Sequence, residues 1–404
     1  MRIKRKKLRN IKVGVNDIYY IAFTIYLIVY TSRITMWGYE ISTTMFDYAV
    51  IFMVFIKMIL SHKISLRNFV LYALIVAVAI IIYSTTTFNT PIMIAIMLVG
   101  AEKTDYKRLV KLHLTICGII VLAATVSSML GFLQDRIFYS YFTSEIRHSM
   151  GMTYVTIWSS MVTCILLDYD ILKYDSLKAY DIIINIVVMV FNYYWSRTRI
   201  ELLTGILLIA LLVLPDRIKE SHLLKCIFVS SYPIGLAFSV ITTFGYKINP
   251  SRYAALNYFS DNRITQAAKA LSLYGIKPFG TYFATQGGGS VKFNQSIGYF
   301  FIDCFYMNVL LQYGIIFLLI LSAIAIYLSI KEYKKNNYLM LLLFAIAAFK
   351  GIVVSCVFTY YLCPIFLYIF ADVFAKKKKS IIHGTQSIKY EQKKNLLSQG
   401  MSYE

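Results

Sequence analysis

The polar stretch GYKINPSRYAALNYFSDNRITQAAKALSLYGIKPFG, residues 245–280, interrupts a chain that is otherwise strongly apolar. It opens an insert, residues 245–301, whose six basic residues are Lys247, Arg252, Arg263, Lys269, Lys277 and Lys292. Long apolar runs flank this insert on both sides, which indicates a loop between membrane spans. Positive charge is normally kept on the cytoplasmic side of membrane proteins. If the insert faces outward, its cations need a reason, and binding of an anionic ligand is the obvious one.

The composition predicts an all-α polytopic membrane protein. Hydrophobic residues make up 58% of the 404 residues, which is more than a soluble core of this length can hide. Apolar runs that can cross a bilayer recur along the chain and predict about twelve transmembrane helices. We expect these spans at 18–34, 41–60, 69–86, 89–101, 112–132, 151–167, 182–195, 200–214, 225–244, 302–329, 338–356 and 358–374.

The distribution of charge predicts the orientation of these spans. With the N-terminus inside, and with the span-end residues Arg33, Lys57 and Lys225 counted on the side that they lie nearest, the cytoplasmic side carries 29 of the 41 Lys and Arg and the outer side carries 11, while Lys350 lies within a span. This split follows the positive-inside rule and places both termini in the cytoplasm. The predicted organisation is a basic cytoplasmic N-terminus (1–17), spans one to nine (18–244), a large extracytoplasmic loop containing a short helix (245–301), spans ten to twelve (302–374) and a disordered cytoplasmic tail (375–404).

Several function classes are disfavoured by the same residues. The basic residues are divided among short loops and two tails and do not form one continuous stripe, so we expect no nucleic-acid partner. The six cysteines show no CxxC or Cys/His spacing, so neither a zinc site nor a disulfide framework is indicated. No Asp-rich motif lies on the outer side, and we expect neither a metal nor another cofactor.

Three outer segments carry arginine: LQDRIFYSYFTSEIRHSMG (133–151), SRTRIE (196–201) and the insert. A guanidinium is a planar fork of donors that stays charged and grips two phosphate oxygens at once, which suits a pyrophosphate. The candidate ligands of such an anion are Arg136, Arg147, Arg197, Arg199, Arg263 and Lys277. A helix is predicted over 260–275, with Ser260 as N-cap and Gly275 as the stop. Arg263 then lies in its first turn, where free N–H groups favour an anion.

Two residues are candidates for a catalytic base. Asp303 opens the apolar run that follows the insert, and a carboxylate at such a position is costly unless it is paired or used. It could equally be a helix cap or the structural ion-pair partner of an outer arginine. His148 is the only histidine expected outside and could accept a proton near neutral pH, although a single loop histidine is more often idle.

Three motifs give the chain a resemblance to a known family. They are WSRTR (195–199), NYFSDNRITQAAKALSLYGIKPFG (257–280) and IDCFYMNVLLQYG (302–314). In order, spacing and predicted topology they resemble the Wzy-type polymerases of bacterial capsule and O-antigen synthesis, members of the O-antigen ligase and polymerase superfamily.

The resemblance implies a metal-independent, inverting glycosyltransferase of GT-C type in the bacterial cytoplasmic membrane. Such an enzyme transfers a growing glycan from undecaprenyl pyrophosphate to the next lipid-linked repeat unit on the outer face. By motif position, Arg197 and Arg263 would contact the pyrophosphate. Asp303 falls where relatives carry His or Asp followed by Asn, and Cys304 departs from that pattern.

The expected partners are the undecaprenyl-pyrophosphate-linked repeat units, the lipid bilayer, a flippase and a chain-length regulator. Two alternatives remain open at the level of sequence. A ligase of the same superfamily would join the glycan to another acceptor. A flippase for lipid-linked oligosaccharides would share the substrate and the helix count, but it would place its cations in a central cavity within the spans.

Overall fold

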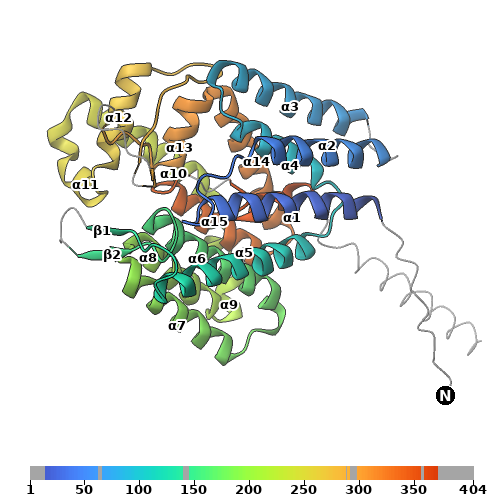
Figure 1. Ribbon diagram of the computed structural model, residues 1–404, viewed down its shortest axis with the longest axis horizontal. Coiled ribbons are helices and arrows are strands. Elements are labelled where there is room, and N and C mark those ends of the chain that lie inside the picture. Colours follow the sequence, from blue (N-terminus) through green and yellow to red (C-terminus); the bar gives the residue numbers. More distant parts are fainter. Residues whose placement is uncertain are drawn as a thin grey trace, which may run out of the picture.

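The computed structural model describes residues 14–61, 66–139, 145–287, 289–291, 298–355 and 359–371. Within these ranges the chain is 73% helical, and it forms one bundle with a single two-stranded hairpin (Figure 1). The all-α class is therefore confirmed. The predicted basic N-terminus up to residue 13, Lys292 and the predicted tail lie outside the described residues.

Each of the first nine expected spans corresponds to one helix. These helices are α1 (Val15–Arg33), α2 (Thr44–Leu60), α3 (Leu66–Thr86), α4 (Thr90–Gly100), α5 (Tyr106–Met129), α6 (Val155–Lys173), α7 (Ala179–Ser196), α8 (Arg199–Leu212) and α10 (His222–Ile248). A single turn, α9 (Asp216–Lys219), connects α8 to α10. Helix existence could thus be predicted from apolar runs alone, and the expected boundaries differ from the observed ones by up to six residues.

Five helices are long and apolar enough to cross a membrane: Asn68–Thr86, Tyr106–Met129, Val155–Ser176, His222–Ile248 and Ile315–Lys334. Two shorter apolar helices, α4 and α15 (Tyr338–Gly351), lie beside them in the chain. Large apolar side chains on the outer helix faces are more than half exposed, for example Phe52, Val187 and Ile234. Because soluble proteins rarely expose so many apolar side chains, these faces fit contact with lipid and a multi-pass membrane protein.

The last three expected spans differ from the structure. The run expected as a tenth span is divided into α13 (Phe305–Asn308), a π turn (Val309–Tyr313) and α14 (Ile315–Lys334). The break lies at Gly314, which has a φ of 90°. The eleventh expected span is α15, which ends at Gly351, earlier than predicted.

In the described part of the twelfth expected span the chain forms no α-helix. It forms a buried 3-10 helix, Pro364–Ile369, instead. Proline cannot donate a helical hydrogen bond, and non-helical backbone inside a bundle needs other partners. Here the buried His113 ring supplies one, since its Nε2 lies 3.0 Å from the carbonyl oxygen of Tyr361.

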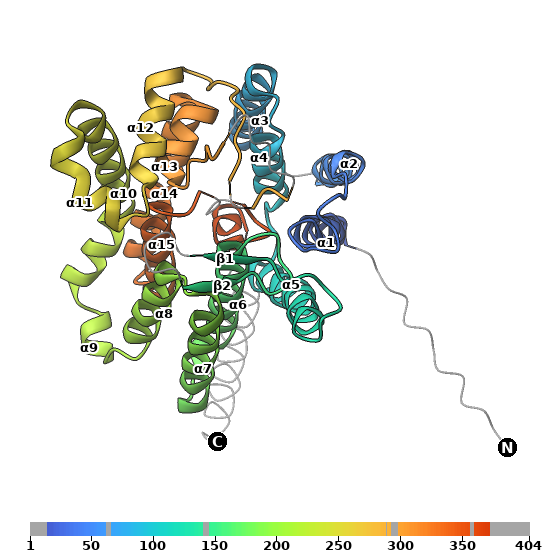
Figure 2. The same cartoon turned by 60° about the vertical axis from the view of Figure 1, so that its left-hand side comes forward.

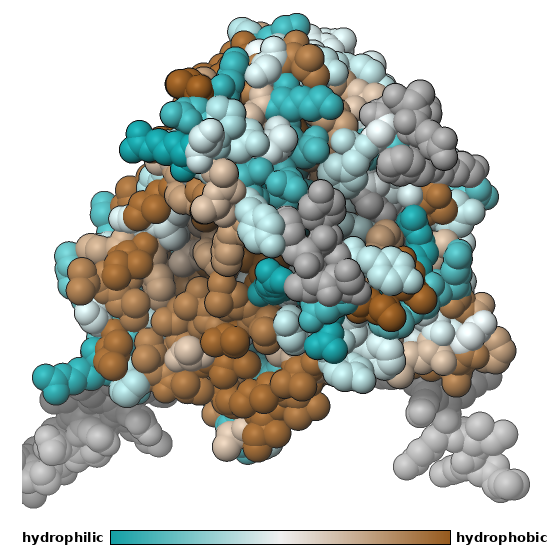
Figure 3. Space-filling view, turned by 90° about the vertical axis from the view of Figure 1, so that its left-hand side faces the viewer, coloured by the Kyte–Doolittle hydropathy of each residue, from teal (hydrophilic) through white to brown (hydrophobic). Residues whose placement is uncertain are grey.

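The helices of the bundle begin and end at two opposite ends of the molecule. At one end Asp17 of α1 pairs with Arg108 of α5 (2.9 Å), and Lys225 of α10 donates to Asn336 after α14 (3.1 Å). At the other end lie the insert and the hairpin of β1 (Ile137–Tyr139) and β2 (Ile146–His148), as Figures 1 and 2 show. We call this the insert end. Viewed from there, hydrophilic side chains gather over the upper and central surface, and a broad hydrophobic area lies at the lower left (Figure 3).

The insert contains two helices, α11 (Ala254–Phe259) and α12 (Arg263–Tyr274), and α12 packs on α10. The predicted stop at Gly275 is confirmed, with φ at 66°. The predicted N-cap is wrong, because Asn262 holds that position in a left-handed conformation. The side chain of Asn257 takes over the capping: its Oδ1 accepts from the N–H of Thr265 (3.0 Å), and its Nδ2 donates to Asn262 (2.9 Å). A cap supplied from the preceding helix could not be found by local spacing.

A close backbone crossing fixes the insert to the start of α14. The N–H groups of Ile315 and Ile316 donate to the carbonyls of Lys277 (3.1 Å) and Pro278 (3.2 Å). Only glycine fits at Gly314, because a Cβ there would lie 2.3 Å from the Pro278 carbonyl oxygen. The crossing holds α12 and the segment before α13 at fixed positions beside the bundle.

Candidate functional site

Four of the six predicted anion ligands line one cavity at the insert end, although they come from three separate loops. Arg147 belongs to β2, Arg197 ends α7, Arg199 begins α8 and Arg263 begins α12. The cavity, which we call the arginine cavity, has a volume of about 340 Å³. Two carboxylates, Glu145 and Asp261, also line it, so cations outnumber anions on its wall.

Arg147 is held in place by its neighbours. Its Nε donates to the Ser196 carbonyl oxygen (2.9 Å) and an Nη donates to the Thr198 hydroxyl (3.2 Å). Burial lowers its pKa, and the nearby positive charges of Arg263 and Arg199 act in the same direction. Arg147 is thus close enough to Arg199 and Arg263 for their charges to repel, and an anion placed among them would relieve that repulsion.

Arg197 and Arg199 have no carboxylate within ion-pair distance in the described part of the chain. Arg197 adopts a left-handed conformation (φ 50°), which is uncommon for a residue with a side chain, and its guanidinium carbon lies 5.4 Å from the ring centre of Tyr194. Arg199 is exposed at the first position of α8, where free helix N–H groups add positive potential. These two residues are therefore available to an external anion.

Arg263 connects the arginine cavity to a second one. An Nη donates to the carbonyl oxygen of Val353 (2.7 Å), and its Nε lies 3.6 Å from Oδ2 of Asp303. Burial by itself would lower the pKa of Arg263, but the negative charge of Asp303 raises it above its usual value. Arg263 and Val353 line both cavities, so the two adjoin.

The second cavity, the Asp303 cavity, has a volume of about 270 Å³ and is lined among others by Tyr154, Ser160, Glu201 and Tyr299. Burial raises the pKa of Asp303, an effect that Arg263 and a long hydrogen bond from the Tyr299 hydroxyl (3.5 Å) oppose in part. Asp303 lies in the extended segment before α13, and its neighbour Cys304 lines the arginine cavity instead. A carboxylate with a raised pKa is better suited to accept a proton than an ordinary aspartate.

Glu201, which lines the Asp303 cavity, belongs to a buried ion pair. Nζ of Lys350, on α15, lies 2.9 Å from Oε2 of Glu201, on α8, and the Ser160 hydroxyl donates to the other carboxylate oxygen (2.5 Å). Sequence reasoning did not predict this pair. The available signal was two opposite charges within apolar runs, since each is costly to bury alone.

The arginine cavity also has an apolar wall. Leu203 of α8, Phe238 of α10 and Phe349 of α15 contribute to it. Leu203 and Phe238 are 52% and 41% exposed, and α15 packs against both α8 and α10. The cavity therefore reaches the apolar surface between α8 and α10, with α15 as its floor. Such a site suits an amphiphile with an anionic head and an apolar tail.

Three predicted residues lie apart from these cavities. Both Nη atoms of Arg136 are engaged, with the carbonyl oxygens of Thr153 (2.6 Å) and Ser290 (3.2 Å). Lys277 is exposed, and only its backbone has an evident role, in the crossing at α14. His148 pairs with Asp135 (2.5 Å) and stacks edge-on against Trp195 (5.0 Å). The geometry thus favours Asp303 over His148 as the base.

Comparison with known proteins adds no relative, because no family model, no curated protein and no solved structure matches the chain. Among the residues that the structure describes, no group of three or more His, Cys, Asp or Glu side chains is placed to hold a metal ion. The resemblance to Wzy-type polymerases stays a prediction from the sequence motifs, and function has to be argued from the site itself.

Proposed function

We propose that the protein is an inverting membrane glycosyltransferase that polymerises lipid-linked oligosaccharide repeat units into a bacterial surface polysaccharide. The observation that carries this proposal is the arginine cavity, where four guanidinium groups surround a space that reaches the apolar helix surface. A polyprenyl pyrophosphate has matching chemistry, with two adjacent phosphates and a long apolar chain. In this proposal the insert end faces outward from the cytoplasmic membrane.

The arginines would act on the leaving group. As the bond between the anomeric carbon and the pyrophosphate breaks, negative charge grows on the leaving oxygen. Arg197 and Arg199 are free to bind that charge, while Arg147 and Arg263 are already fixed by the contacts described above. Donors that are in place before the reaction stabilise the transition state without reorganisation.

Asp303 would act on the acceptor. Its carboxylate takes the proton from a hydroxyl group of the acceptor sugar, and that oxygen forms the new bond to the anomeric carbon. The bond from the anomeric carbon to the pyrophosphate breaks, and its electron pair stays on the lipid pyrophosphate. Attack from the face opposite the leaving group inverts the anomeric configuration. Because Arg263 lines both cavities, it would lie between the leaving group and the base.

A ligase would use the same donor site and differ only in its acceptor. A flippase is disfavoured because the cavity's arginines lie in loops and at helix ends, and not midway along the spans. Among the described residues, α15 carries the buried cation Lys350, and Glu201 neutralises its charge.

The decisive experiment replaces single arginines in a host from which the chromosomal gene is deleted. Arg197→Ala and Arg199→Ala should each reduce polymer by about a hundredfold or more, the usual loss for one transition-state donor. Arg197→Lys should restore only part of the activity, because an ammonium group cannot bind two oxygens in parallel. Arg252→Ala is the matched control, since Arg252 is an exposed insert arginine that does not line the cavity. Polymer is measured by gel electrophoresis of surface glycan at matched protein levels.

The deletion itself distinguishes the function classes. Surface glycan truncated to one repeat unit indicates a polymerase, free polymer that is not joined to its acceptor indicates a ligase, and inward-facing lipid-linked units indicate a flippase. Full polymer in both Arg197→Ala and Arg199→Ala would exclude the pyrophosphate role of the cavity.

A further inference from the structure

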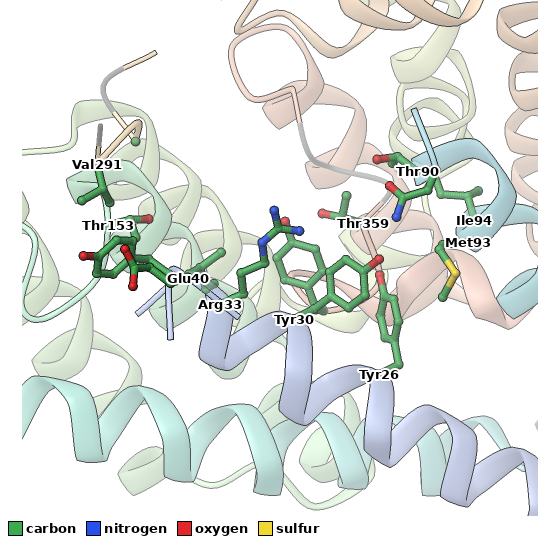
Figure 4. Close-up of a pocket in the computed structure, with 15 residues that line it drawn as sticks. Tyr26, Tyr30, Arg33, Glu40, Thr90, Met93, Ile94, Thr153, Val291 and Thr359 are labelled. Atoms are coloured by element: carbon green, nitrogen blue, oxygen red, sulfur yellow. The ribbon is translucent and has the colours of Figure 1, made fainter. Parts of the chain in front are cut away.

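The largest of the described cavities lies on the other side of the Asp303 cavity and has a volume of about 650 Å³ (Figure 4). One face of α1 supplies Tyr26, Tyr30 and Arg33, spaced so that all three point into it. Tyr39 and Tyr361 also line it. We call it the tyrosine cavity. None of its lining residues has a part in the proposed handling of the pyrophosphate.

The tyrosine rings form a connected aromatic wall. The ring centres of Tyr26 and Tyr30 are 4.5 Å apart, and Tyr361 stacks against Tyr30 at 5.5 Å with 26° between the planes. A tyrosine ring offers an apolar face and a polar hydroxyl. Sugar rings have the complementary form, with C–H groups on their faces and hydroxyl groups at their edges.

The polar groups of this wall are fixed in position from behind. The buried Asp47 of α2 accepts from the Tyr30 hydroxyl (2.9 Å) and from Nδ2 of Asn89 (2.7 Å). Such second contacts hold binding groups in one geometry before a ligand arrives. Arg33 is exposed and has no carboxylate within ion-pair distance among the described residues, and it extends into the middle of the cavity (Figure 4). Hydrogen-bond donors and acceptors are thus distributed around an aromatic floor.

The three cavities form a row. Gly289 lines both the tyrosine cavity and the Asp303 cavity. The consecutive residues Thr153 and Tyr154, before α6, line one each. The Asp303 cavity in turn shares Arg263 with the arginine cavity. The cavity of Asp303, a carboxylate suited to proton transfer, thus lies between the arginine cavity and the tyrosine cavity.

We propose that the tyrosine cavity is a carbohydrate-binding site that holds the oligosaccharide of the acceptor with its reacting hydroxyl directed towards Asp303. The proposal rests on the proposed function, because it assigns the acceptor of that transfer. The volume fits a ligand of several rings, and the mixed lining of tyrosine rings, hydroxyl groups and one arginine matches the faces and edges of sugar rings. Arg33 would favour an oligosaccharide that carries a carboxylate or many hydroxyl groups.

The test uses full-length protein in nanodiscs and the lipid-free repeat-unit oligosaccharide, released from the host's lipid-linked pool by mild acid. Binding is measured by saturation-transfer NMR. Arg33→Ala and Tyr30→Leu should each weaken binding about tenfold, as expected for an anchoring arginine or tyrosine. Tyr327→Leu, which removes an exposed tyrosine of α14, should leave binding unchanged. Arg197→Ala should also leave it unchanged, because this probe carries no pyrophosphate.

Turnover provides a second readout. Arg33→Ala should raise the KM for the lipid-linked acceptor with little change in kcat, since the lost contact is remote from the reacting atoms. Failure of the oligosaccharide to bind the wild-type protein, or equal binding to all variants, overturns the carbohydrate site and leaves the donor site untouched. Conversely, weakened binding in Arg33→Ala together with normal polymer in Arg197→Ala and Arg199→Ala supports the carbohydrate site and rejects the proposed pyrophosphate chemistry.

Discussion

Removing Lys350 should destabilise the fold strongly, and removing Glu201 as well should restore most of the loss. The two side chains are 6% and 1% exposed, and their charged atoms lie 2.9 Å apart. Lys350→Met leaves the Glu201 carboxylate buried with only Ser160 as a hydrogen-bond donor. Breaking one partner of a buried pair costs about 3–5 kcal/mol, because the remaining charge has lost both water and its counter-ion.

The double variant Glu201→Gln/Lys350→Met removes both charges at nearly constant volume. The glutamine amide oxygen can still accept from Ser160, so no buried charge remains. We expect the double variant to be less destabilised than Lys350→Met alone, with a coupling energy of about 2 kcal/mol or more.

The assay is denaturant unfolding in mixed micelles, followed by tryptophan fluorescence. Trp158 is a suitable reporter, because it is buried in α6 and its indole N–H donates to Thr125 (2.9 Å). The single variants for comparison are Lys350→Met and Glu201→Gln. If their losses in free energy of unfolding sum to the loss of the double variant within about 0.5 kcal/mol, the ion-pair reasoning is refuted. A stable double variant without transferase activity would instead assign Glu201 a role in the Asp303 cavity beyond pairing with Lys350.

Three further predictions concern topology, backbone geometry and the base. In a Cys-free background, a single cysteine at the exposed position of Lys269 should react from outside with an impermeant thiol reagent and one at Lys334 should not; the reverse pattern would invert the orientation. Gly314→Ala should destabilise the protein clearly more than Gly131→Ala. Both glycines have positive φ, but only at Gly314 would the added Cβ lie 2.3 Å from a backbone atom. Equal losses of stability in thermal unfolding would contradict the backbone crossing. The polymerisation rate should rise with pH through the raised pKa of Asp303, because only the carboxylate can accept a proton. Asp303→Asn should be slower by about a hundredfold and lose this pH dependence in a reconstituted assay, and an unchanged rate would remove Asp303 as the base.

The helical bundle could be predicted from the sequence because apolar runs report burial in lipid or protein directly. Six cations were expected to converge on one anion, from their residue type and their expected side of the membrane; four of them, Arg147, Arg197, Arg199 and Arg263, line one cavity, and Arg136 and Lys277 do not. The non-helical path of the expected twelfth span was not predicted. An apolar run does not reveal that Pro364 disfavours an α-helix there, or that the distant His113 contacts the Tyr361 carbonyl oxygen. The tyrosine cavity was also missed: its residues come from five distant parts of the chain, and tyrosine near a membrane has a simpler explanation as an interfacial anchor.

The backbone conformation of Arg197 supports the proposed binding role of the arginine cavity. A left-handed residue with a side chain costs on the order of 1 kcal/mol, and glycine would avoid that cost in the turn between α7 and α8. The arginine gains no ion pair there in the described part of the chain, its guanidinium carbon lies 5.4 Å from the ring centre of Tyr194, and it lines the same cavity as three other arginines. A backbone conformation with this cost lowers the stability of the free protein. An anion bound among the four guanidinium groups would relieve the repulsion between Arg147 and its neighbours Arg199 and Arg263, so we expect a bound anion to stabilise the protein.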